Sequence, residues 1–228
     1  MRATSSEIQE DFDRLAAFDD GRWDHNRHYH PFLLRQLPQS RDVALEVGCG
    51  TGAFARALAA YFRRVVAVDL SPEMLRHARN RSQGIQNLEY HQADLRSFGF
   101  PAESFDCIAA IATLHHVPLG EAWAKLRAAL RPGGVLLLLD LYRPSTLSDW
   151  LLSGVAVPAN LLLRRRNLGT WRQSPEVRRA WAAHAQGDAY PRIAEIRELS
   201  ERMLPGAVLR RHVLWRYSLV WQKPVSSA

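Results

Sequence analysis

Residues 42–60 of this 228-residue chain read DVALEVGCGTGAFARALAA, and this stretch decides the fold. Val43, Leu45 and Val47 alternate as in a β-strand, and apolar residues at helical spacing follow the GCGTG run. The three glycines between them carry no Cβ atoms that would keep a ligand from the backbone. The next helix presents free N–H groups at its start. The stretch therefore predicts a strand, a glycine loop and a helix that together cradle a small molecule.

Glu46 narrows the choice of ligand. The letters also fit a dinucleotide fingerprint, because Gly48, Gly50 and Ala53 match G-x-G-x-x-G/A and Asp69 lies about 20 residues further on. A carboxylate two residues before the first glycine, however, would repel a pyrophosphate and attract an ammonium or a sulfonium. The sequence therefore favours a cationic ligand.

The local string resembles motif I of the class I S-adenosylmethionine-dependent methyltransferases, and later motifs extend the resemblance. Asp69 ends an apolar run, and Ser71 and Pro72 then indicate an N-cap followed by a proline in the first helical turn. A carboxylate at this strand end can accept both ribose hydroxyls of an adenosine. Residues 130–144, LRPGGVLLLLDLYRP, are similar to the family's helix, turn and strand after motif IV. The match is specific over about residues 40–143 and architectural over 191–224.

The resemblance implies an α/β fold. We expect a Rossmann-like, doubly wound, mostly parallel seven-stranded sheet with an antiparallel last strand and a helical lid. The length fits one domain, so residues 1–228 are expected to form a single methyltransferase domain with an N-terminal helical cap (1–39) and a lid insertion (144–190). Strands are expected at 43–47, 65–69, within 87–98, within 104–117, and at 135–139, 208–214 and 217–222, and helices at 31–37, 119–130 and 192–204.

The resemblance also implies a cofactor, S-adenosyl-L-methionine, with S-adenosyl-L-homocysteine as the product. In the family the acid after the third strand accepts from the adenine amino group, and the adjacent apolar residue lies against the ring. For a tyrosine in the N-terminal segment, packing onto the sheet is an equal alternative to a cofactor contact. The candidate cofactor-binding residues are Tyr29, Glu46, Gly48, Gly50, Thr51, Gly52, Asp69, Leu70, Met74, Asp94, Leu95, Ala110 and Ile111.

The catalytic candidates are His115 and His116, which leave the fourth strand on the ligand side of an open α/β sheet. Imidazole titrates near neutral pH, so either could act as a general base, although packing or capping would also explain them. Residues His184, Asp188 and Tyr190 form a polar group that lines the pocket or makes caps and turns. The candidate substrate residues are His25, Tyr142, His184 and Tyr190. Residues 111–117 contain no acid, so no metal is expected.

The expected reaction is methyl transfer to an oxygen, nitrogen or carbon atom of a small hydrophobic or aromatic acceptor, because the lid insertion begins with an apolar tract. Other activities stay open. The pocket could serve a lyase or cyclase that uses S-adenosylmethionine without methylating. The excess of 30 Lys and Arg over 23 Asp and Glu could indicate an RNA methyltransferase. An NAD-dependent oxidoreductase is disfavoured by Glu46.

Composition suggests the partners and the compartment. The arginines are spread along the chain, so no nucleic acid partner is expected, and the protein is expected to be a monomer or a homodimer. The apolar tract 151–163 is shorter than the roughly 20 residues of a spanning helix, so no stable membrane insertion is expected. Arginines 164–166 beside it indicate either an anionic membrane contact or a solvated helix end. The N-terminus lacks a signal-like apolar region and the two cysteines suggest no disulfide, which favours a cytoplasmic location.

Overall fold

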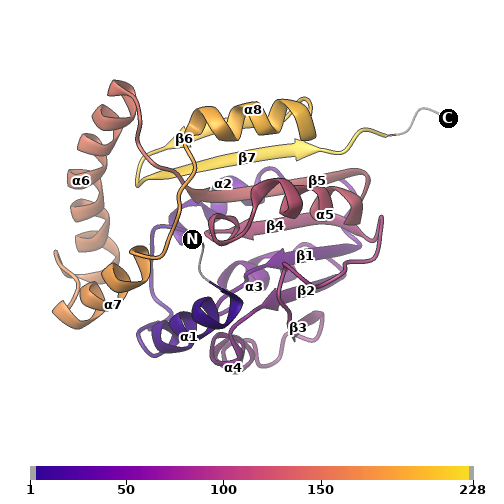
Figure 1. The fold of residues 1–228 in the computed structure, drawn as a ribbon. Coiled ribbons are helices and arrows are strands. Elements are labelled where there is room, and N and C mark those ends of the chain that lie inside the picture. Colours follow the sequence, from indigo (N-terminus) through magenta and orange to yellow (C-terminus); the bar gives the residue numbers. More distant parts are fainter. Residues whose placement is uncertain (1–3, 226–228) are drawn as a thin grey trace.

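The computed structural model describes residues 4–225, and its centre is a seven-stranded sheet (Figure 1). The strand order is β3-β2-β1-β4-β5-β7-β6. Strand β7 pairs antiparallel with both of its neighbours, and the other pairs are parallel. The strands are β1 (Val43–Val47), β2 (Arg64–Asp69), β3 (Leu88–Gln92), β4 (Phe105–Ile111), β5 (Leu130–Leu141), β6 (Val208–His212) and β7 (Arg216–Gln222). The expected fold class is confirmed.

Helices cover both faces of the sheet. On one face lie α2 (His30–Leu34), α3 (Ala53–Ala59) and α4 (Pro72–Arg81), and on the other lie α5 (Leu119–Ala129) and α8 (Ile193–Met203) (Figure 1). Every residue of β4 is buried, as expected for a strand between two helical layers. Because both faces are filled, the carboxyl edge of the sheet is the place left for a ligand.

The start of α4 shows how local sequence positions a strand end. The Ser71 hydroxyl accepts a hydrogen bond from the Met74 N–H at 3.0 Å, and Pro72 occupies the first turn, where its missing N–H costs nothing. The cap fixes the chain directly after β2. The carboxylate of Asp69, the last residue of β2, is thereby held at the sheet edge.

Several boundaries differ from the expected ones. Strand β5 begins at Leu130 rather than at residue 135, and its pairing with β4 jumps from Phe105 opposite Leu130 to Cys107 opposite Val135. The residues of the expected turn are therefore an irregularity within the strand. Helix α2 stops at Leu34, three residues early, ahead of Pro38, which disfavours helical backbone in the residue before it.

Three helices outside the two layers surround one edge of the sheet. Helix α1 (Ser5–Ala16) packs against α4, and the insertion after β5 contributes α6 (Leu147–Leu168) and α7 (Pro175–Ala185). Figure 1 shows α6 standing at the margin of the molecule, with α7 at its foot and close to α1. Pro158 lies inside α6. Among residues 4–225, the helices are all too short or too polar to cross a membrane.

The hairpin turn between β6 and β7 has an unusual backbone. Leu214 and Trp215 have φ values of 65° and 58°, a left-handed region that non-glycine residues seldom adopt. The Leu214 side chain is fully buried in the core, and Trp215 reaches the cavity described below. The turn therefore holds two bulky side chains in a strained conformation.

Candidate active site

A cavity of about 860 Å³ lies at the carboxyl ends of the central strands, beneath α1 and α7. It unites residues from the glycine loop, the ends of β1, β2 and β4, and the lid insertion. Of the residues expected at the site, those that line it are His25, Glu46, Gly48, Gly50, Thr51, Asp69, Leu70, Met74, Asp94, Leu95, Ile111, His115, His116, His184 and Tyr190.

The glycines of the loop serve different purposes. A Cβ at Gly48 would lie 2.1 Å from the Thr113 Oγ1 atom, so this glycine is required by packing against the chain itself. A Cβ at Gly50 would meet no atom within 4 Å. Both residues have positive φ. Gly50 therefore leaves open space at the cavity wall, where a ligand can approach the backbone.

Asp69 is anchored by backbone donors. Its Oδ2 atom accepts from the Gly50 N–H at 2.7 Å and its Oδ1 atom from the Ser71 N–H at 2.9 Å. Burial raises the pKa of the Asp69 carboxyl, although these hydrogen bonds oppose the rise. A carboxylate has about four acceptor positions. Asp69 can therefore accept further hydroxyl donors from within the cavity.

Glu46 is a buried acid with an unused oxygen. Its side chain is 2% exposed, and its Oε2 atom has no hydrogen-bond partner among the described residues. Burial and the charge of nearby Asp69 raise the pKa of Glu46 well above its usual value, although the Ala55 N–H lowers it. An unpaired buried carboxylate is costly. Its position on the cavity wall fits the ammonium group of an amino-acid ligand.

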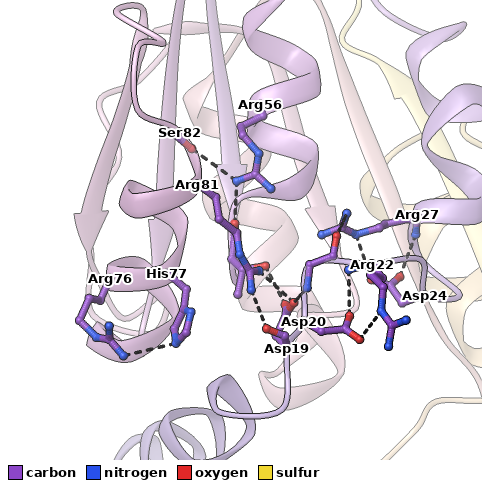
Figure 2. Close-up of polar contacts among 12 residues, drawn as sticks. Asp19, Asp20, Arg22, Asp24, Arg27, Arg56, Arg76, His77, Arg81 and Ser82 are labelled. Carbon is purple, nitrogen blue, oxygen red and sulfur yellow. Dashed lines mark hydrogen bonds and ion pairs between the residues drawn. The ribbon is translucent and has the colours of Figure 1, made fainter. Parts of the chain in front are cut away.

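Hydrogen bonds hold the N-terminal segment over the half of the cavity that the glycine loop lines. The Ser5 hydroxyl of α1 donates to Asp94 Oδ2 at 2.6 Å, and the Thr51 hydroxyl of the glycine loop donates to Asp19 Oδ2 at 2.7 Å. Figure 2 shows Arg81 of α4 pointing at Asp19, whose Oδ1 atom it contacts at 2.9 Å. The N-terminal segment, which forms a cover over the cavity, therefore contacts both the glycine loop and α4.

The stretch that follows Asp19 is held by short-range ion pairs. Arg22 lies 2.6 Å from Asp20, and Arg27 lies 3.4 Å from Asp24 (Figure 2). His25, in the same stretch, bonds to Asn160 of α6 through its Nε2 atom at 2.7 Å. This contact links the N-terminal segment to the lid insertion next to the cavity wall, which His25 lines.

A buried histidine lines the other half of the cavity and is paired with a buried aspartate. His115 lies in a 3₁₀ turn, η2 (Leu114–His116), directly after β4, and its Nδ1 atom is 2.6 Å from Asp140 Oδ1 at the end of β5. Asp140 also accepts the His115 backbone N–H at 3.1 Å. Burial alone would lower the pKa of His115, but the carboxylates of Asp140 and Asp188 raise it above its usual value. The pair fixes both the orientation and the tautomer of the imidazole.

Asp188 of the lid insertion joins this pair to two further histidines. Its Oδ1 atom lies 3.2 Å from His116 Nδ1, and its Oδ2 atom lies 3.7 Å from both His115 Nε2 and His184 Nε2. The Tyr190 hydroxyl donates to Oδ2 at 2.6 Å. The carboxylate of Asp188 thus lies among imidazoles from η2 and from α7.

This cluster could also hold a cation. Ligand atoms of His115, His116 and Asp188 all lie within 4.8 Å of one another. Imidazole and carboxylate groups are ordinary ligands of divalent transition metals. The expected absence of a metal therefore stays a prediction that chelation has to test.

Four expected site residues lie away from the cavity lining. Tyr29 is buried and its hydroxyl donates to the Val213 carbonyl, so it packs onto the sheet. A Cβ at Gly52 would be 2.2 Å from the Tyr90 hydroxyl, so this glycine serves contact with β3. Ala110 is buried within β4, and Tyr142 is buried in the core on the α8 side.

Asp188, which the sequence grouped with His184 and Tyr190, does line the cavity. Other residues of the site were not among the candidates. Asp140 pairs with His115 without lining the cavity, and Phe12, Trp181 and Trp215 supply aromatic walls. The register of β4 and β5, which pairs Ile111 with Leu139, places Asp140 beside the turn that carries His115. This adjacency could have been inferred from strand order. Nothing in the sequence places Trp215, because hairpin turns rarely use such residues.

Comparison with known proteins identifies methyltransferases as relatives of this chain. A family model described as "Methyltransferase domain" matches residues 45–138. The chain is 29% identical over 213 residues to an uncharacterized methyltransferase of Mycobacterium tuberculosis, which covers 90% of this chain and 100% of the relative. It is 32% identical over 205 residues to a ubiquinone biosynthesis O-methyltransferase of Xylella fastidiosa, with 81% of this chain and 80% of the relative covered.

A solved structure agrees in fold. The N-methyltransferase NodS from Bradyrhizobium japonicum, in complex with S-adenosyl-L-homocysteine, matches with a TM-score of 0.63 and 20% identity. The match covers 95% of this chain and 98% of NodS. At this identity the likeness concerns the arrangement of the strands and helices.

Proposed function

Because this chain belongs to the S-adenosylmethionine-dependent methyltransferases, we propose that it transfers the methyl group of that cofactor to a small hydrophobic or aromatic acceptor. The observation that carries the choice of acceptor is the wall of the cavity next to the histidine cluster. Phe12, Trp181 and Tyr190 line it beside His115 and His116. Such a mixture of aromatic surface and a few convergent polar groups is typical of sites for small molecules.

The residues of the glycine-loop half fit the cofactor. Glu46 offers an unpaired carboxylate oxygen to an ammonium group, Asp69 offers free acceptor positions to ribose hydroxyls, and Gly50 leaves open space beside them. When bound, S-adenosylmethionine supplies a methyl group that is already activated by the sulfonium. The chain therefore has mainly to hold donor and acceptor in line and to exclude water, and positioning can contribute about 7–11 kcal/mol.

For an acceptor hydroxyl or amine, His115 is the proposed general base. In the neutral imidazole, Nδ1–H donates to Asp140 and Nε2 is free to take the proton that the acceptor loses. The imidazolium formed then lies between Asp140 and Asp188, whose charges both stabilise it. Asp140 acts through His115 and is a positioning residue.

The reaction is tested by incubating the protein with S-adenosylmethionine and host extract, and following the nucleoside products by mass spectrometry. Formation of S-adenosylhomocysteine only with extract supports methyl transfer and leads to the acceptor. If 5′-methylthioadenosine is the only product, the proposal fails and a lyase or cyclase replaces it. A parallel reaction with EDTA is expected to run at the same rate, because the proposed chemistry needs no metal.

His115→Gln should lower the methylation rate by about 10²- to 10⁴-fold, the usual contribution of a general base. The affinity for S-adenosylhomocysteine should stay unchanged, because His115 lies in the acceptor half of the cavity. In the unsubstituted protein the rate should rise with pH through the raised pKa of His115, since only the neutral imidazole takes a proton. The exposed His91 provides the control His91→Gln, which should behave as the parent. Equal rates for both variants would remove the assignment.

A further inference from the structure

The outer side of α6 is a second feature of the molecule that methyl transfer does not explain. Large apolar side chains are exposed along its whole length, including Leu147 (76%), Trp150 (63%), Leu151 (66%) and Leu162 (63%). Monomeric proteins rarely expose so many large apolar side chains in one strip. A strip of this kind marks a surface that contacts something.

The exposed residues share one face of the helix. With 100° per residue, they fall within an arc of about 160°, and this strip consists of Leu147, Trp150, Leu151, Val155, Val157, Pro158, Leu161 and Leu162. The opposite side holds the contacts with the body. There Ala156 is fully buried, Asn160 bonds to His25, and Asp149 pairs with Arg211 at 2.6 Å. The protein therefore holds α6 with its apolar side outward. This agrees with the position of α6 at the margin of the molecule (Figure 1).

Positive charge lies at one end of this strip. Residues 164–179 contain six arginines and one acid, Glu176. Arg165 and Arg166 are exposed, and Arg165 continues the direction of the apolar face. In the part of the chain that the structure describes, no carboxylate pairs with any of these six arginines. Their charge is thus available to an anionic partner.

The size of the strip argues against a second copy of the chain as its partner. A helix of 22 residues is about 33 Å long, and a strip about 10 Å wide along it covers about 330 Å². A stable protein interface buries about 800 Å² per partner. A lipid surface has no such requirement, and it accepts a straight apolar ridge with arginines at its end.

We propose that the outer face of α6, together with the arginines after it, docks the protein on the surface of an anionic lipid membrane. The apolar strip enters the boundary between headgroups and acyl chains, Trp150 lies at the interface, and the arginines contact lipid phosphates. The end of the same helix borders the cavity, because Arg164 and Leu168 line it. The docked protein would therefore hold its cavity next to the membrane, where hydrophobic acceptors dissolve.

Vesicle flotation tests this proposal without any knowledge of the acceptor. Vesicles of equal parts phosphatidylglycerol and phosphatidylcholine should carry the full-length protein, vesicles of phosphatidylcholine alone should carry much less, and added salt should weaken the binding. Leu151→Ser/Leu162→Ser should lower the partition coefficient about tenfold or more. The control Val208→Ser/Val225→Ser removes two exposed apolar residues elsewhere and should bind as the parent. Arg165→Ser/Arg166→Ser should lower binding to the anionic vesicles by about tenfold or more.

Two results would overturn the proposal. One is equal binding of the parent and the Leu151→Ser/Leu162→Ser variant, provided that circular dichroism shows both folded. The other is a dimer of the parent, seen by analytical ultracentrifugation, that this variant dissociates, because the face would then be an interface between copies. The flotation result is independent of the reaction, so failure of the methyl-transfer proposal would leave it standing.

Discussion

At the scale of single residues, Asp69 makes the sharpest prediction. We expect Asp69→Ala to lower the affinity for S-adenosylmethionine by about 10²-fold or more, because hydrogen bonds to a charged group contribute about 1.5–3 kcal/mol each. Isothermal titration calorimetry measures the loss, and circular dichroism should show an intact fold. Asp42→Ala is the control, since Asp42 is half exposed and lies outside the cavity. Unchanged affinity in Asp69→Ala would exclude the ribose assignment.

Glu46 should make cofactor binding depend on pH. Its pKa in the free protein is raised by burial and by Asp69, and a bound ammonium group would lower it again. Binding should therefore release a proton, and affinity for S-adenosylhomocysteine should rise with pH, by up to about tenfold per pH unit, until free Glu46 ionises. Calorimetry in buffers of different ionisation enthalpy counts the proton. Glu46→Gln should bind more weakly and flatten the profile; an unaltered slope would contradict this role.

The sequence predicted that Asp69 and Glu46 lie at the site, because both belong to contiguous motifs in which spacing along the chain fixes spacing in the fold. It did not pair His115 with Asp140, 25 positions apart, because that contact depends on the neighbouring strands β4 and β5. Tyr29 was placed in the right segment, but its hydroxyl is used by the Val213 carbonyl of the distant β6–β7 turn. A local sequence pattern carries no information about such contacts between distant segments of the chain.

At the scale of elements, two glycines of the same loop have different roles, one in folding and one in binding. Gly48→Ala should lower the free energy of unfolding by about 3 kcal/mol, because its Cβ would collide with Thr113 and its φ is positive. Gly50→Ala should cost only about 1–2 kcal/mol of backbone strain, yet it should weaken cofactor binding because its Cβ enters the cavity.

Urea unfolding and calorimetry on the two variants test this difference. Thr113→Ala combined with Gly48→Ala should recover only part of the lost stability, since it removes the two nearest colliding atoms, the Thr113 hydroxyl and methyl groups, and leaves the Thr113 Cβ atom at 2.7 Å. Equal losses of stability in the two single variants would show that packing does not distinguish the glycines.

The elements themselves were largely predictable, and their ends were less so. Strand β4 and the capped start of α4 follow directly from an apolar run and from Ser71 with Pro72. The start of β5 was placed five residues late, because an Arg-Pro-Gly-Gly stretch predicts a turn while its neighbours still pair with β4. The insertion helices α6 and α7 follow no family pattern. Their positions are set by contacts such as His25 with Asn160.

At the scale of the whole molecule, the cavity joins segments that are far apart in the chain. The N-terminal cover, the glycine loop and α7 all contribute to its wall. Cofactor binding should therefore stabilise the protein as a unit. At about 100 times the dissociation constant, S-adenosylhomocysteine should add about 2.7 kcal/mol and raise the Tm by about 5–10 °C.

Differential scanning calorimetry measures this shift, and Asp69→Ala at the same ligand concentration should show almost none. Limited trypsin digestion adds a local readout, because Arg22 and Arg172 both lie at the cavity and are exposed. Their cleavage should slow with ligand in the parent protein. A raised Tm without this protection would mean that the lids take no part in binding.

The turn at Leu214 and Trp215 sets backbone strain against side-chain packing and against the shape of the cavity. Replacing the two residues with Asn-Gly would relieve backbone strain of roughly 1–3 kcal/mol per residue, at the cost of the Leu214 packing and of one aromatic wall of the cavity. A relative that no longer uses this wall of the cavity would be free to carry Asn-Gly here, and one that still uses it would keep the two strained residues. The residues that a relative carries at positions 214 and 215 of this three-residue turn would therefore indicate whether its cavity keeps the same wall.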